Sequence, residues 1–383
     1  MRAPEGDGFV PPDYPFDKLA EFSELAEKLP GGAVDLSIGT PCDPPAPAVV
    51  AALSSSGAER GYPPSAGSAE LRQAAARWLE RRFGVQLSPV DELAACVGSK
   101  ELVAGLPHWL RLRSPARDTV LYPSLSYPTY EMGAVLAGCR AVRVPAGPDG
   151  RLDYGAISER DASRALCLWV NSPGNPAGQI EELSEAAAWG RAHGVLVLSD
   201  ECYAEFSWSS PPHTILESGN EGVLALHSLS KRSNLAGLRA GFYAGDGDLV
   251  SYLAAVRRHA GFIVPGPVQH AAAVAFDDDE SVVAQRKAYR ERLVALAEAL
   301  TLASIPAQVP AGAFYLWVKA PDRFAGHGSG SGFELGRYLA ERAGAIVSPG
   351  EAYGPEGADY VRLAVVQPTE RLALVADRLA GTL

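Results

Sequence analysis

The segment LHSLSKRSNLAGLRAG, residues 226–241, sets one of only six lysines among serines and glycines, in a chain that has 28 arginines. It follows an apolar run, GVLALHS at 222–228, that lacks the polar alternation of a half-exposed strand. Two similar runs precede it, RALCLWV at 164–170 and GVLVLS at 194–199, with a helical pattern between them at 181–193. Strand, helix and strand at this spacing predict an α/β fold with a mainly parallel sheet.

Polar side chains follow each of these three predicted strands: Asn171 and Asn175 the first, Asp200 and Tyr203 the second, and Ser228, Ser230 and Lys231 the third. The intervals, 29 residues from Asn171 to Asp200 and 31 from Asp200 to Lys231, each suit one strand-helix unit. In open parallel sheets, ligands bind outside the carboxyl ends of the strands. We therefore expect these loops to share one pocket.

A lysine and an aspartate at that edge match the needs of pyridoxal 5'-phosphate. The lysine amine holds its aldehyde as a Schiff base, and a carboxylate beside the ring nitrogen keeps that nitrogen protonated. Ser228, Ser230 and Arg239 lie close to Lys231 in sequence and suit a phosphate. Gly98, Ser99 and Lys100 fall where a strand is expected to turn into a helix, whose exposed amides bind anions. Any one of these residues alone is more simply structural; the set in order predicts the cofactor.

The composition of the chain excludes several classes of binding partner. The net charge of −11 argues against nucleic acid or an anionic membrane surface. No run of 18 apolar residues occurs, and the first residues lack the apolar core of a signal peptide. The five cysteines are widely spaced without a CxxC pair, which predicts free thiols, no metal site and a cytoplasmic protein. Small molecules are the expected partners.

Two further amphipathic helices are predicted, at 68–83 with Ser68 as its cap and at 282–300. The turn VPGPVQ at 264–269 separates them, and we place the main domain boundary there. The large domain is expected to span 43–266, with RAGFYAGD at 239–246 returning as a strand of its sheet. A smaller α/β domain would combine residues 1–42 with 267–383.

Eight segments together resemble the class I and II aminotransferases, which are fold-type I pyridoxal-phosphate enzymes. They are LSIGTP (36–41), GYPPSAGSAELRQA (61–74), GSKE (98–101), YPSLSYPTYEMGA (122–134), NSPGNPAGQ (171–179), SDECYAEF (199–206), SLSKRSNLAGLRAGF (228–242) and YVRLAV (360–365). The lysine segment and the Asn-Pro-x-Gly segment are the most specific. The resemblance covers almost the whole chain.

This resemblance implies a role for each matched residue. Lys231 would form the internal aldimine and shuttle the substrate proton, Asp200 would pair with the pyridine nitrogen, and Tyr203 and Asn175 would bond the phenolic oxygen of the ring. The phosphate would be held by Gly98, Ser99, Lys100, Ser228, Ser230 and Arg239, and by Tyr62 across the interface of a homodimer with shared active sites. Arg362 would bind the substrate carboxylate, helped by Asn175 and the backbone at Gly39.

The chain departs from the commoner pattern at the aromatic residue that stacks on the pyridine ring. The residue two after Pro123 is Leu125, and a YPTY run begins at Tyr127. Tyr127 is the predicted stacking ring and Tyr130 the alternative. Arg232, which follows the lysine, is expected to touch either the phosphate or the substrate, and the sequence leaves both readings open.

Within the family, the segments at 122–134 and 227–242 most resemble actinobacterial-type N-succinyldiaminopimelate aminotransferases of lysine biosynthesis. That resemblance implies exchange of an amino group between N-succinyl-LL-2,6-diaminopimelate and 2-oxoglutarate. The alternatives on the same cofactor are an aminotransferase for aspartate or aromatic amino acids, a decarboxylase and a β-lyase. A different class is a non-catalytic effector-binding module, which would need an attached DNA-binding segment. No glycine fingerprint of a nicotinamide dehydrogenase follows a predicted strand.

Overall fold

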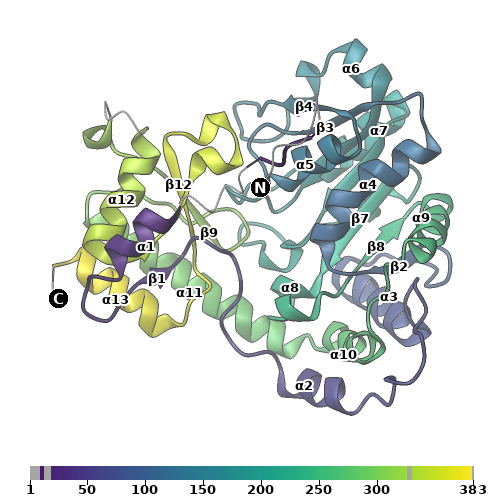
Figure 1. The fold of residues 1–383 in the computed structure, drawn as a ribbon, viewed down its shortest axis with the longest axis horizontal. Coiled ribbons are helices and arrows are strands. Elements are labelled where there is room, and N and C mark those ends of the chain that lie inside the picture. The colour runs from purple at the N-terminus through teal and green to yellow at the C-terminus, as the bar shows by residue number, and fades with distance from the viewer. Residues whose placement is uncertain (1–8, 13–18, 326–329, 382–383) are drawn as a thin grey trace.

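The computed structural model describes residues 9–12, 19–325 and 330–381 (Figure 1). Residues 1–8 and 13–18 of the predicted N-terminal arm lie outside this description. A seven-stranded sheet has the order β2-β8-β7-β6-β5-β3-β4. Its strands are β2 (Leu93–Cys96), β3 (Thr119–Pro123), β4 (Arg140–Val144), β5 (Ala165–Asn171), β6 (Leu196–Asp200), β7 (Val223–Ser228) and β8 (Gly241–Gly245). The three apolar runs of the sequence thus form the adjacent strands β5, β6 and β7.

Strand β8 is the one described member of this sheet that runs against the others. It pairs antiparallel with both β7 and β2, and Ser228 lies opposite Gly241 in the register. The segment at 239–246 therefore returns as a strand of the same sheet, as predicted. Because β8 is antiparallel, its amino end lies at the edge where β7 and β2 have their carboxyl ends. The α/β fold with a mostly parallel sheet is confirmed.

Helices cover both faces of this sheet (Figure 1). One face packs on α2 (Pro47–Ser54), α3 (Ala69–Phe83), α7 (Leu183–His193) and α10 (Gly266–Asp277). The other packs on α4 (Ser99–Arg113), α5 (Thr129–Leu136) and α9 (Gly247–His259). Successive strand residues enter opposite clusters, as Leu168 and Trp169 do, which explains why these strands are apolar throughout.

The predicted cap at Ser68 is present. Its hydroxyl oxygen accepts a hydrogen bond of 3.1 Å from the Leu71 amide, which satisfies one free donor at the start of α3. Gly84 ends the helix at φ 70°, a left-handed conformation that costs glycine little. The remaining short helices near the sheet are α6 (Glu159–Arg164) and α8 (Leu229–Arg232), and α8 carries Lys231 directly after β7.

A second group of elements forms its own apolar core. It contains β9 (Tyr315–Lys319), β11 (Ser348–Pro349) and β12 (Tyr360–Ala364) in an antiparallel sheet of order β11-β12-β9, and β1 (Val34–Asp35) paired parallel with β10 (Ala345–Ile346). Its helices are α11 (Glu280–Leu302), α12 (Ser331–Ala343) and α13 (Thr369–Leu379), and α1 (Ala20–Ala26) packs on α12 in a smaller apolar cluster. The domain division at 43 and 266 stays a prediction, and α10, just beyond 266, packs with α2 and α3 beneath the large sheet.

The N-terminal strand reaches the large sheet after leaving β1. The Ala364 amide donates to the carbonyl of Leu36, and the chain then continues through Gly39 to the edge where β5, β6 and β7 end. Residues from both groups of elements therefore meet there. Among the described helices, none is both long and apolar enough to cross a membrane.

Candidate active site

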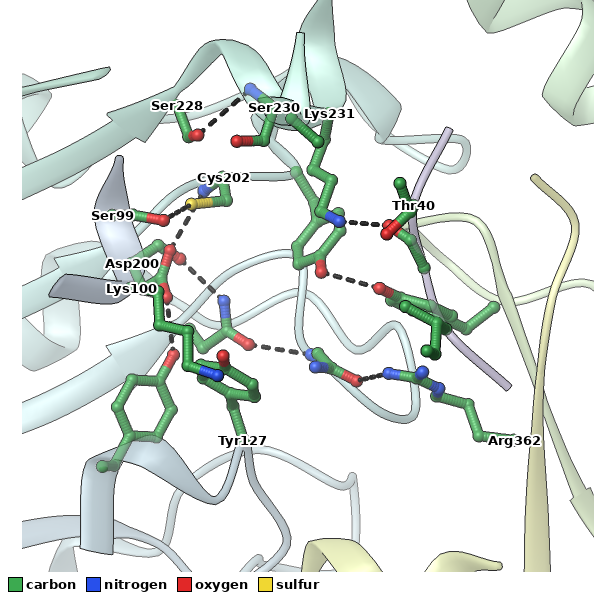
Figure 2. Close-up of a pocket in the computed structure, with 18 of the residues that line it drawn as sticks. Thr40, Ser99, Lys100, Tyr127, Asp200, Cys202, Ser228, Ser230, Lys231 and Arg362 are labelled. Carbon is green, nitrogen blue, oxygen red and sulfur yellow. Dashed lines mark hydrogen bonds between the residues drawn. The ribbon is translucent and has the colours of Figure 1, made fainter. Parts of the chain in front are cut away.

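A cavity of about 410 Å³ opens at the carboxyl ends of the parallel strands (Figure 2). It is lined by Ile38, Gly39, Thr40, Ser99, Lys100, Tyr127, Tyr130, Asn171, Asn175, Asp200, Cys202, Tyr203, Ser228, Ser230, Lys231, Ala236, Arg239, Tyr315 and Arg362. The described structure therefore brings together every predicted site residue except Gly98 and Tyr62. The shared pocket expected from the strand ends is present.

Lys231 enters the cavity from α8, and its ammonium donates a hydrogen bond to the carbonyl of Gly39. Burial lowers the pKa of Lys231 to about 8, and the neighbouring cations Arg362 and Arg239 add to that fall. Asp200 and Cys202 act in the opposite direction. A lysine of this kind releases its proton far more easily than a surface lysine does.

Asp200, at the end of β6, is buried and hydrogen-bonded. Its Oδ2 accepts from the Tyr130 hydroxyl at 2.9 Å and its Oδ1 from the Cys202 amide at 3.3 Å. Burial raises the pKa of this carboxyl, whereas these hydrogen bonds and the charge of Lys231 oppose the rise. Such a carboxylate is suited to pair with a cationic partner in the cavity.

The two candidate stacking rings have different surroundings. Tyr130 is fully buried and stacks on Trp169 with ring centroids 5.0 Å apart, and its hydroxyl is committed to Asp200. Tyr127 is only half-buried, lines the cavity and lies 5.9 Å from the Lys100 ammonium, measured to its ring centroid (Figure 2). This arrangement favours Tyr127 over Tyr130 as the ring that a planar ligand would stack on.

The predicted phosphate residues form a compact set of donors. Gly98 caps α4 at φ 74°, and a Cβ at that position would collide with the guanidinium of Arg239. The position therefore requires glycine. Ser99 begins α4, and the Ser228 oxygen accepts from the Ser230 amide at 3.1 Å. Hydroxyls, helix-start amides and an arginine suit a phosphate dianion, so the residues present fit pyridoxal phosphate.

Arg362 occupies the opposite side of the cavity, on β12 (Figure 2). Its guanidinium donates to Asn175 Oδ1 at 2.7 Å and to the Ser37 carbonyl at 2.5 Å. The rings of Tyr315 and Tyr353 lie 4.1 and 4.8 Å from its Cζ. Its Nε is buried and has no partner among the described residues. A fixed arginine with a spare donor is suited to bind a carboxylate.

Several lining residues had no predicted role, namely Ile38, Thr40, Asn171, Cys202, Ala236 and Tyr315. Cys202 follows Asp200 by two positions, and its thiol donates to the Ser99 hydroxyl at 3.0 Å. The segment SDECY could therefore have indicated Cys202. Tyr315 begins β9, far from every quoted motif, and no local pattern pointed to it.

Arg232 and Tyr62 lie away from this cavity. The Arg232 guanidinium is buried against Glu205, whose carboxylate is 3.2 Å away, and contacts Asp279 at 3.1 Å. The structure supports neither reading left open for Arg232, because its side chain points away from the cavity, toward Trp78 of α3 and the Ala275 carbonyl of α10. Tyr62 is fully exposed. Its predicted contact with the phosphate of a partner subunit stays a prediction.

A buried lysine, a buried aspartate and a helix start suited to an anion, all at one sheet edge, define a pyridoxal-phosphate enzyme of fold type I. The chain belongs to the family described as aminotransferase class I and II, which it matches over residues 32–379. Members of this family depend on pyridoxal phosphate, which agrees with the predicted cofactor.

Three relatives show the range within the family. A 4-dedimethylamino-4-oxo-anhydrotetracycline transaminase of Streptomyces rimosus is 40% identical, over 96% of this chain and 99% of its own. An LL-diaminopimelate aminotransferase of Aquifex aeolicus is 34% identical, over 97% and 96%. The solved structure of a probable N-succinyldiaminopimelate aminotransferase of Thermus thermophilus is 32% identical, with a TM-score of 0.84 over 96% of this chain and 100% of that one.

Proposed function

We propose that this aminotransferase moves an amino group from N-succinyl-LL-2,6-diaminopimelate to 2-oxoglutarate, which gives the 6-oxo acid and glutamate. One observation carries the reaction type: Lys231, Asp200 and Arg362 face one cavity from three different elements. The substrate is supported by the Thermus thermophilus and Aquifex aeolicus relatives, whose names contain diaminopimelate. It is also supported by the resemblance of the segments at 122–134 and 227–242.

In the proposed cofactor site, different residues of the cavity contact the phosphate, the ring nitrogen, the ring face and the phenolic oxygen. Gly98, Ser99, Lys100, Ser228, Ser230 and Arg239 would hold the phosphate, Asp200 the ring nitrogen, Tyr127 the ring face, and Tyr203 with Asn175 the phenolic oxygen. When bound there, pyridoxal phosphate supplies a ring that accepts the electron pair left by the substrate Cα proton.

Lys231 is the residue suited to move that proton. With a pKa of about 8, roughly a tenth of its amine is neutral at pH 7, far more than for a surface lysine, and can act as a base. Arg362 would bind the α-carboxylate through its spare Nε donor and keep the Cα of the substrate near Lys231. Donor and acceptor both carry such a carboxylate, so Arg362 would bind each in turn, and the kinetics would be ping-pong.

The test is the first half-reaction alone. The holoenzyme is mixed with one amino donor and no oxo acid, and the visible absorbance of the lysine-bound cofactor is followed. We expect rapid loss of the band with N-succinyl-LL-2,6-diaminopimelate and with glutamate, and little change with aspartate or tyrosine. Loss only with aspartate or aromatic donors would keep the aminotransferase and overturn the substrate. Release of phenol, pyruvate and ammonia from tyrosine, in place of the 2-oxo acid of tyrosine, would indicate a β-lyase.

The Aquifex aeolicus relative favours a second candidate, free LL-2,6-diaminopimelate, as amino donor. The same assay separates the two, because the succinyl group replaces an ammonium with a carboxylate. A faster reaction with the free diamine would select the second candidate. Lys231→Ala serves as the control: we expect it to abolish transamination while the cofactor still binds weakly.

We further propose a homodimer in which the exposed Tyr62 of each subunit reaches the phosphate site of the other. Mixing Tyr62→Phe and Lys231→Ala subunits tests this arrangement, because each active site would then combine residues of both chains. We expect the mixed dimer to contain one site with Lys231 and an intact Tyr62, and hence to recover activity above that of either parent. A fully active monomer would contradict the arrangement.

A further inference from the structure

Tyr315 contacts both ends of the cavity although no sequence motif contains it. Its hydroxyl lies 2.7 Å from the hydroxyl of Tyr203, and its ring lies 4.1 Å from the Cζ of Arg362. Tyr203 follows β6 on the large sheet, whereas Arg362 stands on β12 of the second sheet. Tyr315 is therefore a direct physical link between the proposed amine end and carboxylate end of the site.

The ring of Tyr315 has little freedom to move. It is 1% exposed, and it packs against the rings of Phe314 at 4.9 Å and Tyr203 at 5.5 Å. A Cβ built on Gly39 would collide with the Tyr315 hydroxyl, so this hydroxyl lies close to the backbone segment whose carbonyl accepts from Lys231. The pairing of β9 with β12 fixes the backbone position of Tyr315, because Tyr315 lies opposite Ala364, two positions from Arg362.

We propose that Tyr315 is a positioning residue, which orients the Tyr203 hydroxyl toward the cofactor and holds the Arg362 guanidinium in place. This inference rests on the roles proposed above for Tyr203 and Arg362. The two functions use different parts of the side chain. The hydroxyl acts on Tyr203, and the face of the ring acts on Arg362.

The hydroxyl argument follows from donor counting. Burial raises the pKa of both Tyr203 and Tyr315, so both phenols are protonated at neutral pH. Each carries a single O–H, and only one of them can donate across the 2.7 Å contact. If Tyr203 points its proton into the cavity, Tyr315 must be the donor to the Tyr203 oxygen. A donor bonded in this way polarises the next hydrogen bond in the chain and strengthens it.

The ring argument follows from electrostatics. The guanidinium of Arg362 lies over the rings of both Tyr315 and Tyr353, and a cation over an aromatic face is attracted to it. These two ring contacts and the hydrogen bonds to Asn175 and Ser37 together hold the guanidinium in place. Removing the Tyr315 ring would therefore let the Arg362 guanidinium turn more freely without removing a charge from the site.

Tyr315→Phe tests the hydroxyl alone, because it keeps the ring. The measurement is the pH at which the visible band of the lysine-bound cofactor titrates in the holoenzyme. A donor to the phenolic oxygen stabilises its negative charge most after the neighbouring nitrogen has lost its proton, so a weaker donor raises this pKa. We expect a rise of roughly 0.3 to 1 unit, with the KM of the amino donor within about twofold. Tyr353→Phe is the matched control and should leave the titration unchanged.

Two further variants separate the possible outcomes. In a Tyr203→Phe background the added Tyr315→Phe change should have no further effect on the titration, because the Tyr203 hydroxyl through which Tyr315 acts is already absent. Tyr315→Leu should shift the titration as Tyr315→Phe does and also raise the KM about tenfold. The inference is overturned if Tyr315→Phe titrates like the wild type, or if Tyr353→Phe shifts it equally. A wild-type holoenzyme without a visible band would instead overturn the proposed function itself.

Discussion

Replacing Arg232 with methionine removes a buried charge that adjoins Lys231 in sequence but lies outside the cavity. The guanidinium is 3% exposed and faces the carboxylate of Glu205, itself 5% exposed, at 3.2 Å. It also donates to the Ala275 carbonyl, to the Asp278 carbonyl at 3.3 Å and to Asp279 at 3.1 Å. Methionine fills a similar volume and offers no donor. The change therefore leaves the Glu205 carboxylate buried without one of the cations that balance its charge.

The expected cost follows from what Glu205 retains. Removing one partner of a buried ion pair costs about 3 to 5 kcal/mol, because the other charge is left in a medium of low polarity. Glu205 keeps the indole donor of Trp78 at 2.9 Å and the guanidinium of Arg82 at 2.7 Å. We therefore expect the lower end, about 3 kcal/mol. For a chain of 383 residues this corresponds to a fall in Tm of about 4 °C.

Two measurements decide the matter. Thermal and urea unfolding of the holoenzyme should show the loss of stability, while the KM of the amino donor and the cofactor Kd should stay within about threefold of the wild type. Asp279→Asn is the control: its carboxylate is 43% exposed, so its loss should cost less than about 1 kcal/mol. A variant Arg232→Met with unchanged stability but weaker cofactor or substrate binding would refute this reasoning and restore the ligand role.

Three other changes have defined outcomes. Arg362→Lys keeps the charge but loses the planar fork, so the KM of the amino donor should rise roughly 10- to 100-fold at unchanged cofactor Kd; an unchanged KM would contradict the carboxylate role. Gly98→Ala combines a left-handed φ with a collision at Arg239, so we expect the cofactor Kd to rise roughly tenfold or more, whereas Gly237→Ala, with no described atom within 4 Å of the added Cβ, should have no effect in the same fluorescence titration. Burial raises the pKa of Glu201 to about 7, so the folded protein binds this proton more tightly than the unfolded chain does. The folded state should therefore lose about 3 kcal/mol of stability as pH rises from about 4 to 7. Glu201→Gln should remove that loss in urea unfolding at pH 5 and 7.5, and an unaltered pH dependence would exclude the assignment.

The parts of the fold that the sequence predicted are those that local pattern controls. Strands β5, β6 and β7 are buried on both faces, so each reads as an unbroken apolar run bounded by polar loops. The long crossover connections between them make these strands parallel, so their carboxyl ends lie at one edge. Asp200 and Lys231 could be placed near each other on these grounds alone. Asn175 follows the same rule.

The parts that could not be predicted depend on contacts between distant segments. Tyr315 reaches the cavity because β9 pairs with β12, and nothing near residue 315 encodes that pairing. Arg232 shows the opposite case, since it adjoins Lys231 in sequence but its side chain leaves α8 on the other side. In a helix, successive residues point about 100° apart, so adjacency in sequence does not give a shared pocket. The resemblance gave Arg362 its role, whereas its two aromatic neighbours needed the tertiary structure.

The antiparallel strand β8 has a consequence for how the site resists unfolding. Ser228, Lys231 and Arg239 all lie within the short connection between β7 and β8 or next to it, so their mutual placement depends on one hairpin-like unit. Arg362 and Gly39, in contrast, are held against that unit by segments from near both chain ends. Structures with separate cores can open in stages. We therefore expect substrate binding to be lost at a lower denaturant concentration than binding of the cofactor phosphate.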